Sequence, residues 1–334
     1  TNNKLNKLFG GPPRDSESEI TQKEMDLAAS VQQITEKIVI NLARNIAKET
    51  GHSNLCLAGG VALNCVANGT LHREKLFNNI WIQPSAGDAG GSLGAALNIH
   101  YSMLNNPRIV NKNDSMKGSY LGPKFENNKI IEQLKSSGAI FHVLENNALI
   151  KKVAELLSTG SAVGWFSGRM EFGPRSLGAR SIIADSRSSS MQKMLNLKIK
   201  YRESFRPFAP SVLSEDASEW FNLSGASPYM LIVADVNEDK RVDVKEIDSE
   251  LFGIEKLNIA RSKIPAVTHI DFSSRIQTVH KETNPKFYAL IEEFKKLTGT
   301  PVLVNTSFNV RGEPIVCTPE NAFKCFMGTE LDIL

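Results

Sequence analysis

Two glycine-rich turns, each directly after a short apolar strand, constrain the fold of this chain more than any other feature. The turns span residues 58–64 and 84–96, and a predicted helix follows each of them. A long helix is expected before the first turn, from Thr21 to a glycine cap at Gly51, because apolar residues recur at steps of three and four. This order predicts an α/β unit, in which ligands bind at the carboxyl ends of the strands.

Both turns carry residues suited to a nucleotide. Gly59 and Gly60 let a nucleotide lie against the backbone, the next helix offers amides to a phosphate, and Asn64 is placed to hydrogen-bond a base or ribose. Asp88 precedes a helix N-terminus, where a carboxylate either caps the helix or binds a metal that bridges phosphates. Together the turns predict a nucleotide-plus-metal site, with helix capping as the alternative for Asp88.

Residues 163–187 form the stretch richest in candidate binding groups. An apolar strand is expected at 162–166, and the glycine-rich segment after it presents planar guanidinium groups, which match phosphate or carboxylate. Two interpretations stand: an anion-binding loop, or a structural loop of ion pairs to Glu171 and Asp185. The arginines concerned are Arg169, Arg175, Arg180 and Arg187.

Two later segments could close the same pocket. One contains Lys200, Arg202 and Arg206 between turn residues and prolines. The alternative interpretation of this segment is a solvated basic loop that binds nothing. Residues 305–309 follow a buried strand at 301–304 and offer short polar side chains, or form a turn bonded to itself.

The remaining elements follow from periodicity and from turn residues. Residues 105–128 are rich in Asn, Lys, Gly and Pro and predict a linker. Further helices are expected at 129–135, 147–158, 189–198, 285–297 and 319–327, the last with Thr318 as its N-cap, and further strands at 140–143, 227–236 and 265–270.

Composition limits the class of protein. A chain of 334 residues suggests two domains, and a net charge of +3 is too mild to indicate nucleic acid. No apolar run is long enough to span a membrane, no signal peptide opens the chain, and the four cysteines lack CxxC spacing, so a cytoplasmic protein with reduced thiols is expected. The non-methionine start at Thr1 and the apolar end predict a fragment.

Three segments, 168–181, 202–210 and 305–313, resemble the NodU/CmcH-type O-carbamoyltransferases, which include nodulation, cephamycin and aminoglycoside carbamoyltransferases. Residues 58–64 and 87–96 look like the nucleotide turns of that family. The resemblance implies an α/β fold with a partial actin-like (ASKHA/Kae1-like) lobe followed by a YrdC-like α/β domain. The implied boundaries are a lead-in at 1–20, the C-terminal lobe of the Kae1-like ATP-binding domain at 21–112, a linker at 113–122 and the YrdC-like domain at 123–334.

The resemblance also implies an activity. The YrdC-like domain would activate carbamoyl phosphate with ATP to carbamoyladenylate, and the carbamoyl group would pass to a hydroxyl of a small-molecule or sugar acceptor. The implied cofactors are ATP and a divalent metal, iron in the family, with magnesium as the alternative. Neither a membrane nor a nucleic acid is expected as a partner, and a homodimer is one option.

Carried over by position, Arg175 and Lys200 match basic carbamoyl-phosphate-site residues, with Arg180 and Arg206 as further cations. The strand-end loop that lines the same pocket contributes Asn305, Ser307 and Asn309. Gly59, Gly60 and Asn64 match nucleotide contacts, and Asp88 matches a metal-ligand aspartate.

One departure from the family pattern limits this expectation. The six histidines include no His-x-x-x-His pair, which in the family comes from an N-terminal lobe, so this chain is expected to carry only the second lobe. Without that lobe the fragment is not expected to hold the metal or to complete transfer. The alternatives are a tRNA threonylcarbamoyladenosine-type enzyme, which shares both domain types, and a non-catalytic nucleotide-binding module.

Overall fold

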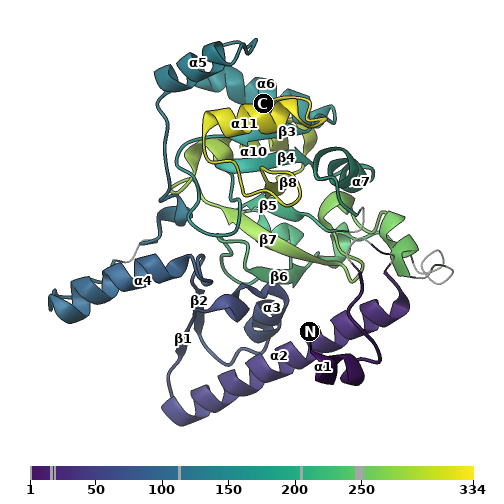
Figure 1. Ribbon diagram of the computed structural model, residues 1–334. Helices are drawn as coiled ribbons and strands as arrows, with labels where there is room; N and C mark the ends of the chain where they lie inside the picture. Colours follow the sequence, from purple (N-terminus) through teal and green to yellow (C-terminus); the bar gives the residue numbers. More distant parts are fainter. Residues whose placement is uncertain are drawn as a thin grey trace. The chain divides into compact units, whose positions relative to one another are not determined.

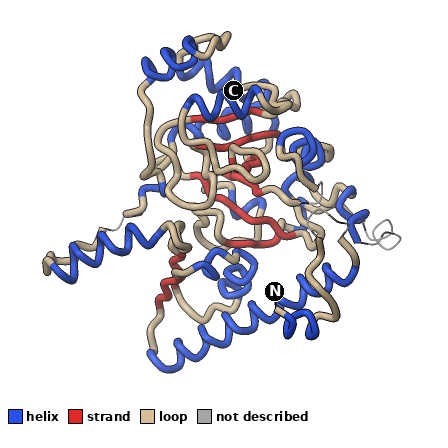
Figure 2. Tube along the Cα trace, in the orientation of Figure 1, coloured by secondary structure: helices blue, strands red, loops and turns tan. Residues whose placement is uncertain are grey.

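The computed structural model describes residues 2–15, 18, 20–111, 114–203, 206–244, 251 and 253–334. The chain divides into two compact units, one of Thr1–Leu55 with Val66–Ile80 and one of Cys56–Cys65 with Trp81–Leu334. The division falls within a two-stranded sheet of β1 (Asn54–Leu57) and β2 (Asn79–Ile82). Both helices and strands contribute (Figure 2), as the prediction of an α/β protein requires.

The smaller unit is built on one long helix (Figure 1). Helix α2 (Gln22–Thr50) begins at the capping box of Thr21 and ends at Gly51 in the left-handed conformation, as its sequence predicts. The unit also contains α1 (Asn3–Leu8) and most of α3 (Cys65–Arg73). Only Ile40 and Ala43 of α2 are buried, whereas four apolar side chains on it are more than half exposed: Val31, Ile34, Ile38 and Leu42.

The larger unit contains a six-stranded mixed sheet in the order β3-β4-β8-β5-β7-β6. All neighbours are antiparallel except β5 and β7, which are parallel. The strands are β3 (Val163–Phe166), β4 (Arg180–Asp185), β5 (Ala209–Leu213), β6 (Ile232–Asp235), β7 (Ser273–Val279) and β8 (Val302–Ser307).

Helices α6 (Asn146–Ser158) and α10 (Pro285–Thr298) pack against each other and share one core with the sheet. Phe287, Leu290 and Phe294 of α10 meet Leu213 of β5 and Leu303 of β8 in that core. The other α-helices described in this unit are α4 (Gly90–Asn98), α5 (Asn127–Ser136), α7 (Met191–Met194), α8 (Ala217–Trp220) and α11 (Pro319–Met327).

The helix-covered face of the sheet changes character along its strands. Side chains two residues apart on a strand share a face, so Leu213 and Leu303 lie on the same face as Ser211 and Asn305. The parallel pairing of Ser211 with Gln277 adds a third polar side chain. The core is therefore apolar at one end of this face and polar at the other.

Several predicted elements differ from the structure. The strand expected at 140–143 is wrong: these residues form no strand, and Ile140 is 99% exposed. The edge of β3 instead contacts the C-terminal segment, where Gly164 N–H donates to the Ile333 carbonyl at 2.8 Å. The strand expected at 265–270 is also wrong, because Pro265–Val267 is a 3-10 turn and the strand begins at Ser273.

Two other predicted elements are shorter in the structure than expected. The strand expected at 227–236 is limited to β6, because Met230 adopts a positive φ of 58° before it. The helix expected at 189–198 is a short α7 that continues as the π-helix Leu195–Ile199. The helices expected at 285–297 and 319–327 are confirmed, including the Thr318 cap. None of the described helices is long and apolar enough to cross a membrane.

Candidate anion site

A buried glutamate shapes the loop between β3 and β4. Glu171 is 5% exposed, and its Oε1 accepts the N–H groups of Leu177 at 2.6 Å, Ala179 at 2.8 Å and Arg180 at 3.3 Å. Burial raises the pKa of Glu171, and these backbone N–H groups oppose that rise. Gly178 is required here, because its φ is +99° and an added Cβ would lie 2.3 Å from the ring of Phe287.

Arg180 belongs to the interior. Its guanidinium donates to the carbonyls of Ser167 at 3.2 Å and Pro123 at 3.3 Å, and it stacks 3.6 Å from the ring centroid of Phe166. Burial lowers the pKa of Arg180 to about 10, so it stays charged at neutral pH. The structure thus directs Arg180 toward carbonyls of its own chain.

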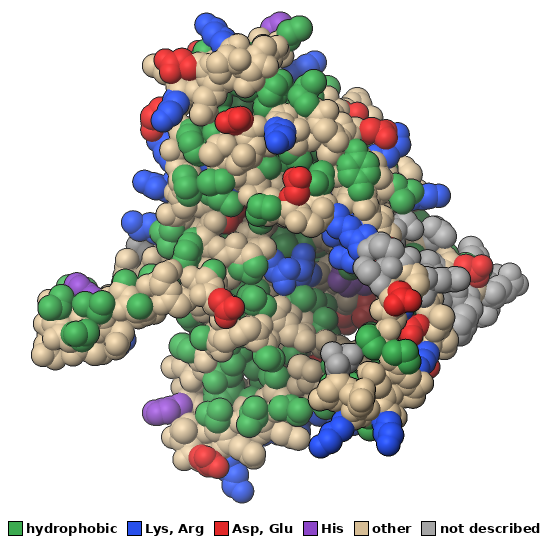
Figure 3. All heavy atoms as spheres, in the orientation of Figure 1, with side chains coloured by type: hydrophobic (Ala, Val, Ile, Leu, Met, Phe, Trp, Pro, Cys, Tyr) green, Lys and Arg blue, Asp and Glu red, His purple; other side chains and the backbone are tan. Residues whose placement is uncertain are grey.

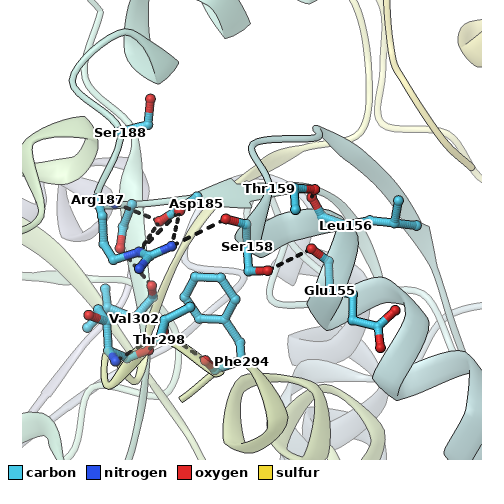
Figure 4. A network of polar contacts seen from close by, with 12 residues as sticks. Glu155, Leu156, Ser158, Thr159, Asp185, Arg187, Ser188, Phe294, Thr298 and Val302 are labelled. Carbon is cyan, nitrogen blue, oxygen red and sulfur yellow. Dashed lines mark hydrogen bonds and ion pairs between the residues drawn. The ribbon is translucent and has the colours of Figure 1, made fainter. Parts of the chain in front are cut away.

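Arg187 is likewise held by its own chain, as the ion-pair alternative predicted. Its guanidinium forms a fork with Asp185, with Nη2 to Oδ2 at 2.7 Å and Nε to Oδ1 at 3.0 Å, and it reaches the Ser158 carbonyl (Figure 4). The Phe294 ring lies 5.4 Å from the guanidinium. Exposed Arg169 donates to the Gly122 carbonyl at 3.0 Å.

Arg175 differs from these three arginines. Its Nη2 reaches the carbonyl of Leu63 at 3.4 Å, at the end of the turn that follows Gly59. Its Nε is buried and has no hydrogen-bond partner among the described residues. Because an unsatisfied buried donor is costly, this N–H is a group that an added acceptor would stabilise.

A second arginine lies close to Arg175. Burial lowers the pKa of Arg275 on β7 to about 10, repulsion from Arg175 lowers it further, and a hydrogen bond with the Cys65 side chain opposes the shift. Arg202 also contributes to the repulsion on Arg275. Like charges therefore lie near one another here, which is typical of a site that binds an anion.

Lys200, Ser307 and Asn309 are brought together, as the sequence predicts. Lys200 is 3% exposed, and its ammonium donates to Asn309 Oδ1 at 2.8 Å, to the Asn309 carbonyl at 3.0 Å and to the Ser307 carbonyl. Ser307 Oγ donates to Asn309 Oδ1 at 2.6 Å. Burial, and then the charge of Arg202, lower the pKa of Lys200 to about 7.

More cations surround Lys200. Burial lowers the pKa of Arg202 to about 10, with Arg206 and Arg311 adding repulsion, while Glu203 opposes the shift. Glu203 pairs with Arg206 at 3.2 Å and lies 3.8 Å from Arg311. Lys and Arg side chains gather in the middle of the view in Figure 3. The electrostatics favour a ligand with more than one negative charge.

Comparisons with known proteins agree with this chemistry. The family model "Carbamoyltransferase C-terminus" matches residues 154–334, which include all the cations described above, and "Carbamoyltransferase N-terminus" matches residues 1–97. This chain belongs to the carbamoyltransferase family.

The relatives of this carbamoyltransferase chain are longer than the chain itself. It is 60% identical over 336 residues to "Uncharacterized protein sll1178" of Synechocystis, covering all of this chain and 55% of that protein. It is 40% identical to "Nodulation protein NolO" of Bradyrhizobium diazoefficiens, covering 93% of this chain and 53% of that protein. "Nodulation protein U" of Sinorhizobium fredii is 33% identical over 91% of this chain and 48% of its own length. The chain thus spans about half the length of these relatives.

The two glycine-rich turns contact each other. Gly59 N–H donates to the Ala86 carbonyl at 2.8 Å, and Gly59 needs its glycine because φ is +100°. A Cβ built on Gly60 would meet nothing within 4 Å, so open space lies beside this backbone. Asn64 closes the turn through its N–H, which donates to the Val61 carbonyl at 2.9 Å.

The metal expected from the family does not fit the described residues alone. Asp88 is exposed, and the described part of the chain holds no cluster of three His, Cys, Asp or Glu side chains that could bind a metal ion. No side-chain cap bond is formed at the start of α4 either. Asp88 remains a predicted metal ligand, and among the described residues it does not belong to a cluster of three possible ligands.

Asn305 occupies a different position from Ser307 and Asn309. It is 1% exposed, and its Nδ2 donates to Gln277 Oε1 at 2.8 Å and to Ser211 Oγ at 3.1 Å. Its side chain is thus engaged inside the polar end of the core.

Sequence reasoning missed Arg275 and Gln277, because it placed the strand at 265–270. The signal was present in residues 273–279, where Ile276, Thr278 and Val279 favour a strand and an arginine interrupts it.

Proposed function

We propose that the protein containing this chain is an O-carbamoyltransferase that activates carbamoyl phosphate with ATP and passes the carbamoyl group to a hydroxyl of a small-molecule or sugar acceptor. The observation that carries the proposal is the buried Nε of Arg175, which has no partner in the part of the chain that the structure describes and lies near Arg275. A phosphate supplies the acceptor oxygens and the negative charge that this arrangement lacks.

The proposed chemistry has two steps before transfer. Water adds to the carbamoyl carbon, the bond between that carbon and the phosphate oxygen breaks, and phosphate leaves with carbamate as the other product. A carbamate oxygen then attacks the α-phosphorus of ATP, the bond to the bridging oxygen breaks, and pyrophosphate departs, so that carbamoyladenylate forms. In the transfer, the acceptor hydroxyl loses its proton and attacks the carbamoyl carbon, the bond from that carbon to the phosphate oxygen of AMP breaks, and AMP leaves.

The residues of this chain would act mainly by position and charge. Arg175 and Arg275 would hold the phosphate of carbamoyl phosphate and stabilise the charge that develops as it leaves. Lys200, with Ser307 and Asn309 fixed around it, would supply a further cation at the same pocket. The guanidinium of Arg206 lies farther out in an ion pair with Glu203 and would add long-range attraction.

The nucleotide would lie along the turn of Gly59 and Gly60, where the backbone is open to a close approach. We further propose that residues 21–112 form the second lobe of an actin-like, Kae1-like domain and residues 123–334 a YrdC-like domain. The mixed sheet with helices on its face supports the second assignment only at the level of α/β class. No step is assigned to a metal, and a homodimer stays a prediction.

Pyrophosphate exchange tests the activation step. The longest natural form of the protein should incorporate labelled pyrophosphate into ATP only when carbamoyl phosphate is present. Exchange that requires threonine and bicarbonate instead would indicate a threonylcarbamoyladenosine-type enzyme. Absence of exchange with either substrate set, in protein that binds ATP, would indicate a non-catalytic nucleotide-binding module.

A further inference from the structure

The Arg175 loop is attached to the sheet through a small set of buried polar contacts. Gln277 on β7 is 2% exposed, and its Nε2 donates to the Leu177 carbonyl at 2.8 Å. Its Oε1 accepts from Ser211 Oγ at 2.6 Å and from Asn305 Nδ2 at 2.8 Å. The amide nitrogen of Gln277 thus donates to the loop, and its amide oxygen accepts hydrogen bonds from the sheet.

Asn305 makes a second attachment one residue earlier in the loop. Its Nδ2 lies 3.3 Å from the Ser176 carbonyl, and its Oδ1 accepts from Ser176 Oγ at 3.3 Å. These contacts are longer than those of Gln277, so the Gln277 amide makes the shorter link between sheet and loop. Ser176 directly follows Arg175, so a shift of this backbone moves the guanidinium.

The strand of Gln277 also carries the second arginine of the site. Arg275 and Gln277 are two residues apart on β7 and therefore share a face. One strand thus presents Arg275 directly and holds the loop that presents Arg175. The link between Gln277 and Leu177 therefore joins the loop of Arg175 to the strand of Arg275.

We propose that Gln277 is a positioning residue for the anion site, which fixes Arg175 against Arg275 by holding the Leu177 carbonyl. The proposal rests on the proposed function of the site as a carbamoyl-phosphate pocket. Tyr120 OH also donates to the Leu177 carbonyl, at 2.7 Å, so loss of Gln277 leaves the carbonyl bonded, and Asn305 on β8 and Trp165 on β3 still bond Ser176 and Gly178 of the loop. What is lost is the Gln277 link between the loop and β7, the strand of Arg275.

The test uses two substitutions at Gln277 in the complete chain. Gln277→Glu keeps the size of the side chain and the acceptor for Ser211 and Asn305 but cannot donate to Leu177 when ionised. Gln277→Leu removes both functions. Inorganic phosphate and carbamoyl phosphate are the probes, their dissociation constants are measured by calorimetry, and backbone amide exchange is followed at residues 177–180.

Both variants should bind either probe about tenfold more weakly, and the amides of residues 177–180 should exchange faster. If Gln277→Leu fails to fold, Gln277→Glu still tests the proposal. Thr278→Val is the matched control, because Thr278 is also 2% exposed and points to the opposite face, where its Oγ1 accepts the Ser227 N–H at 3.0 Å. That variant should lose stability and keep its affinity for phosphate.

A double-mutant cycle separates positioning from a general loss of stability. In an Arg175→Lys background, which has lost the guanidinium fork, a Gln277 substitution should weaken phosphate binding much less than in the wild type. Equal weakening in both backgrounds, or unchanged affinity with slow exchange at residues 177–180, would overturn the role of Gln277. If Arg175→Lys itself leaves phosphate affinity unchanged, the proposed anion site fails instead.

Discussion

Arg180 and Arg175 stand five residues apart in one loop, and their surroundings are opposite. The Arg180 end is closed, because its guanidinium donates to backbone carbonyls and stacks on an aromatic ring. The backbone N–H groups beside it donate to Glu171. The Arg175 end is open: its buried Nε finds no partner within the described ranges, and a second arginine lies nearby. Of these two arginines, the one that its own chain satisfies supports the fold, and the one with an unsatisfied donor is available to a ligand.

The largest effect is expected at the closed end. Arg180→Met should lower the free energy of unfolding by about 3–5 kcal/mol, because buried carbonyls lose their donors and Glu171 loses the nearby positive charge. Urea denaturation measures the change, with Arg175→Met as the control that should change stability far less. Equal losses in the two variants would remove the distinction between the two ends.

The next effect is expected at the open end. Arg175→Ala should weaken carbamoyl phosphate binding by about 2–4 kcal/mol, because the phosphate loses a charged, directional donor. Calorimetry with a thermal-unfolding scan checks affinity and fold together. Arg169→Ala, an exposed arginine of the same loop, should bind normally. Intact binding by a folded Arg175→Ala protein would contradict the assignment.

A smaller, pH-dependent effect is expected at Lys200. Because its pKa is about 7, the free protein holds this amine mostly neutral at about pH 8, and a bound phosphate should draw a proton onto it. Proton uptake, measured by calorimetry in buffers of different ionisation enthalpy, should be larger at about pH 8 than at about pH 6. Subtracting the same measurement on Lys200→Met removes the titration of phosphate itself.

The lowered pKa of Lys200 also predicts the direction in which stability changes with pH. The folded pKa lies below the ordinary value of 10.5, so the unfolded chain binds more protons between these two values. The contribution of Lys200 to stability should therefore rise as pH increases through that window. A Lys200 contribution that falls over this range, obtained by comparison with Lys200→Met, would show that the amine is not buried as described.

The smallest effect is expected at Arg187, outside both ends of the loop. Its ion pair with Asp185 is partly exposed, with 34% of the Arg187 side chain accessible, so Arg187→Ala should cost about 1 kcal/mol or less in thermal unfolding. Phosphate affinity should stay at the wild-type value. A large loss of affinity would extend the anion site to this strand end and weaken the comparison.

The sequence alone predicted the elements whose signals are local. The caps at Gly51 and Thr318, together with the helical periodicity that begins at Thr21, located α2 and α11, because caps and periodicity act within a few residues. It also grouped Lys200 with Ser307 and Asn309, since the residues around them resemble a known family. The domain boundaries and the roles of the predicted site residues remain predictions.

Tertiary structure decided which arginine is available to a ligand. In the sequence, Arg175 and Arg180 belong to one glycine-rich stretch, and only the family resemblance distinguishes Arg175 as a residue of the carbamoyl-phosphate site. Burial against Phe166 and the Pro123 carbonyl satisfies Arg180, while β7 brings Arg275 beside Arg175 from 100 residues later in the chain. Such long-range pairings depend on the register of β5, β7 and β8, which no local pattern specifies. The sequence therefore showed which residue types could bind an anion. It did not show which of these side chains are buried and already hydrogen-bonded by their own chain.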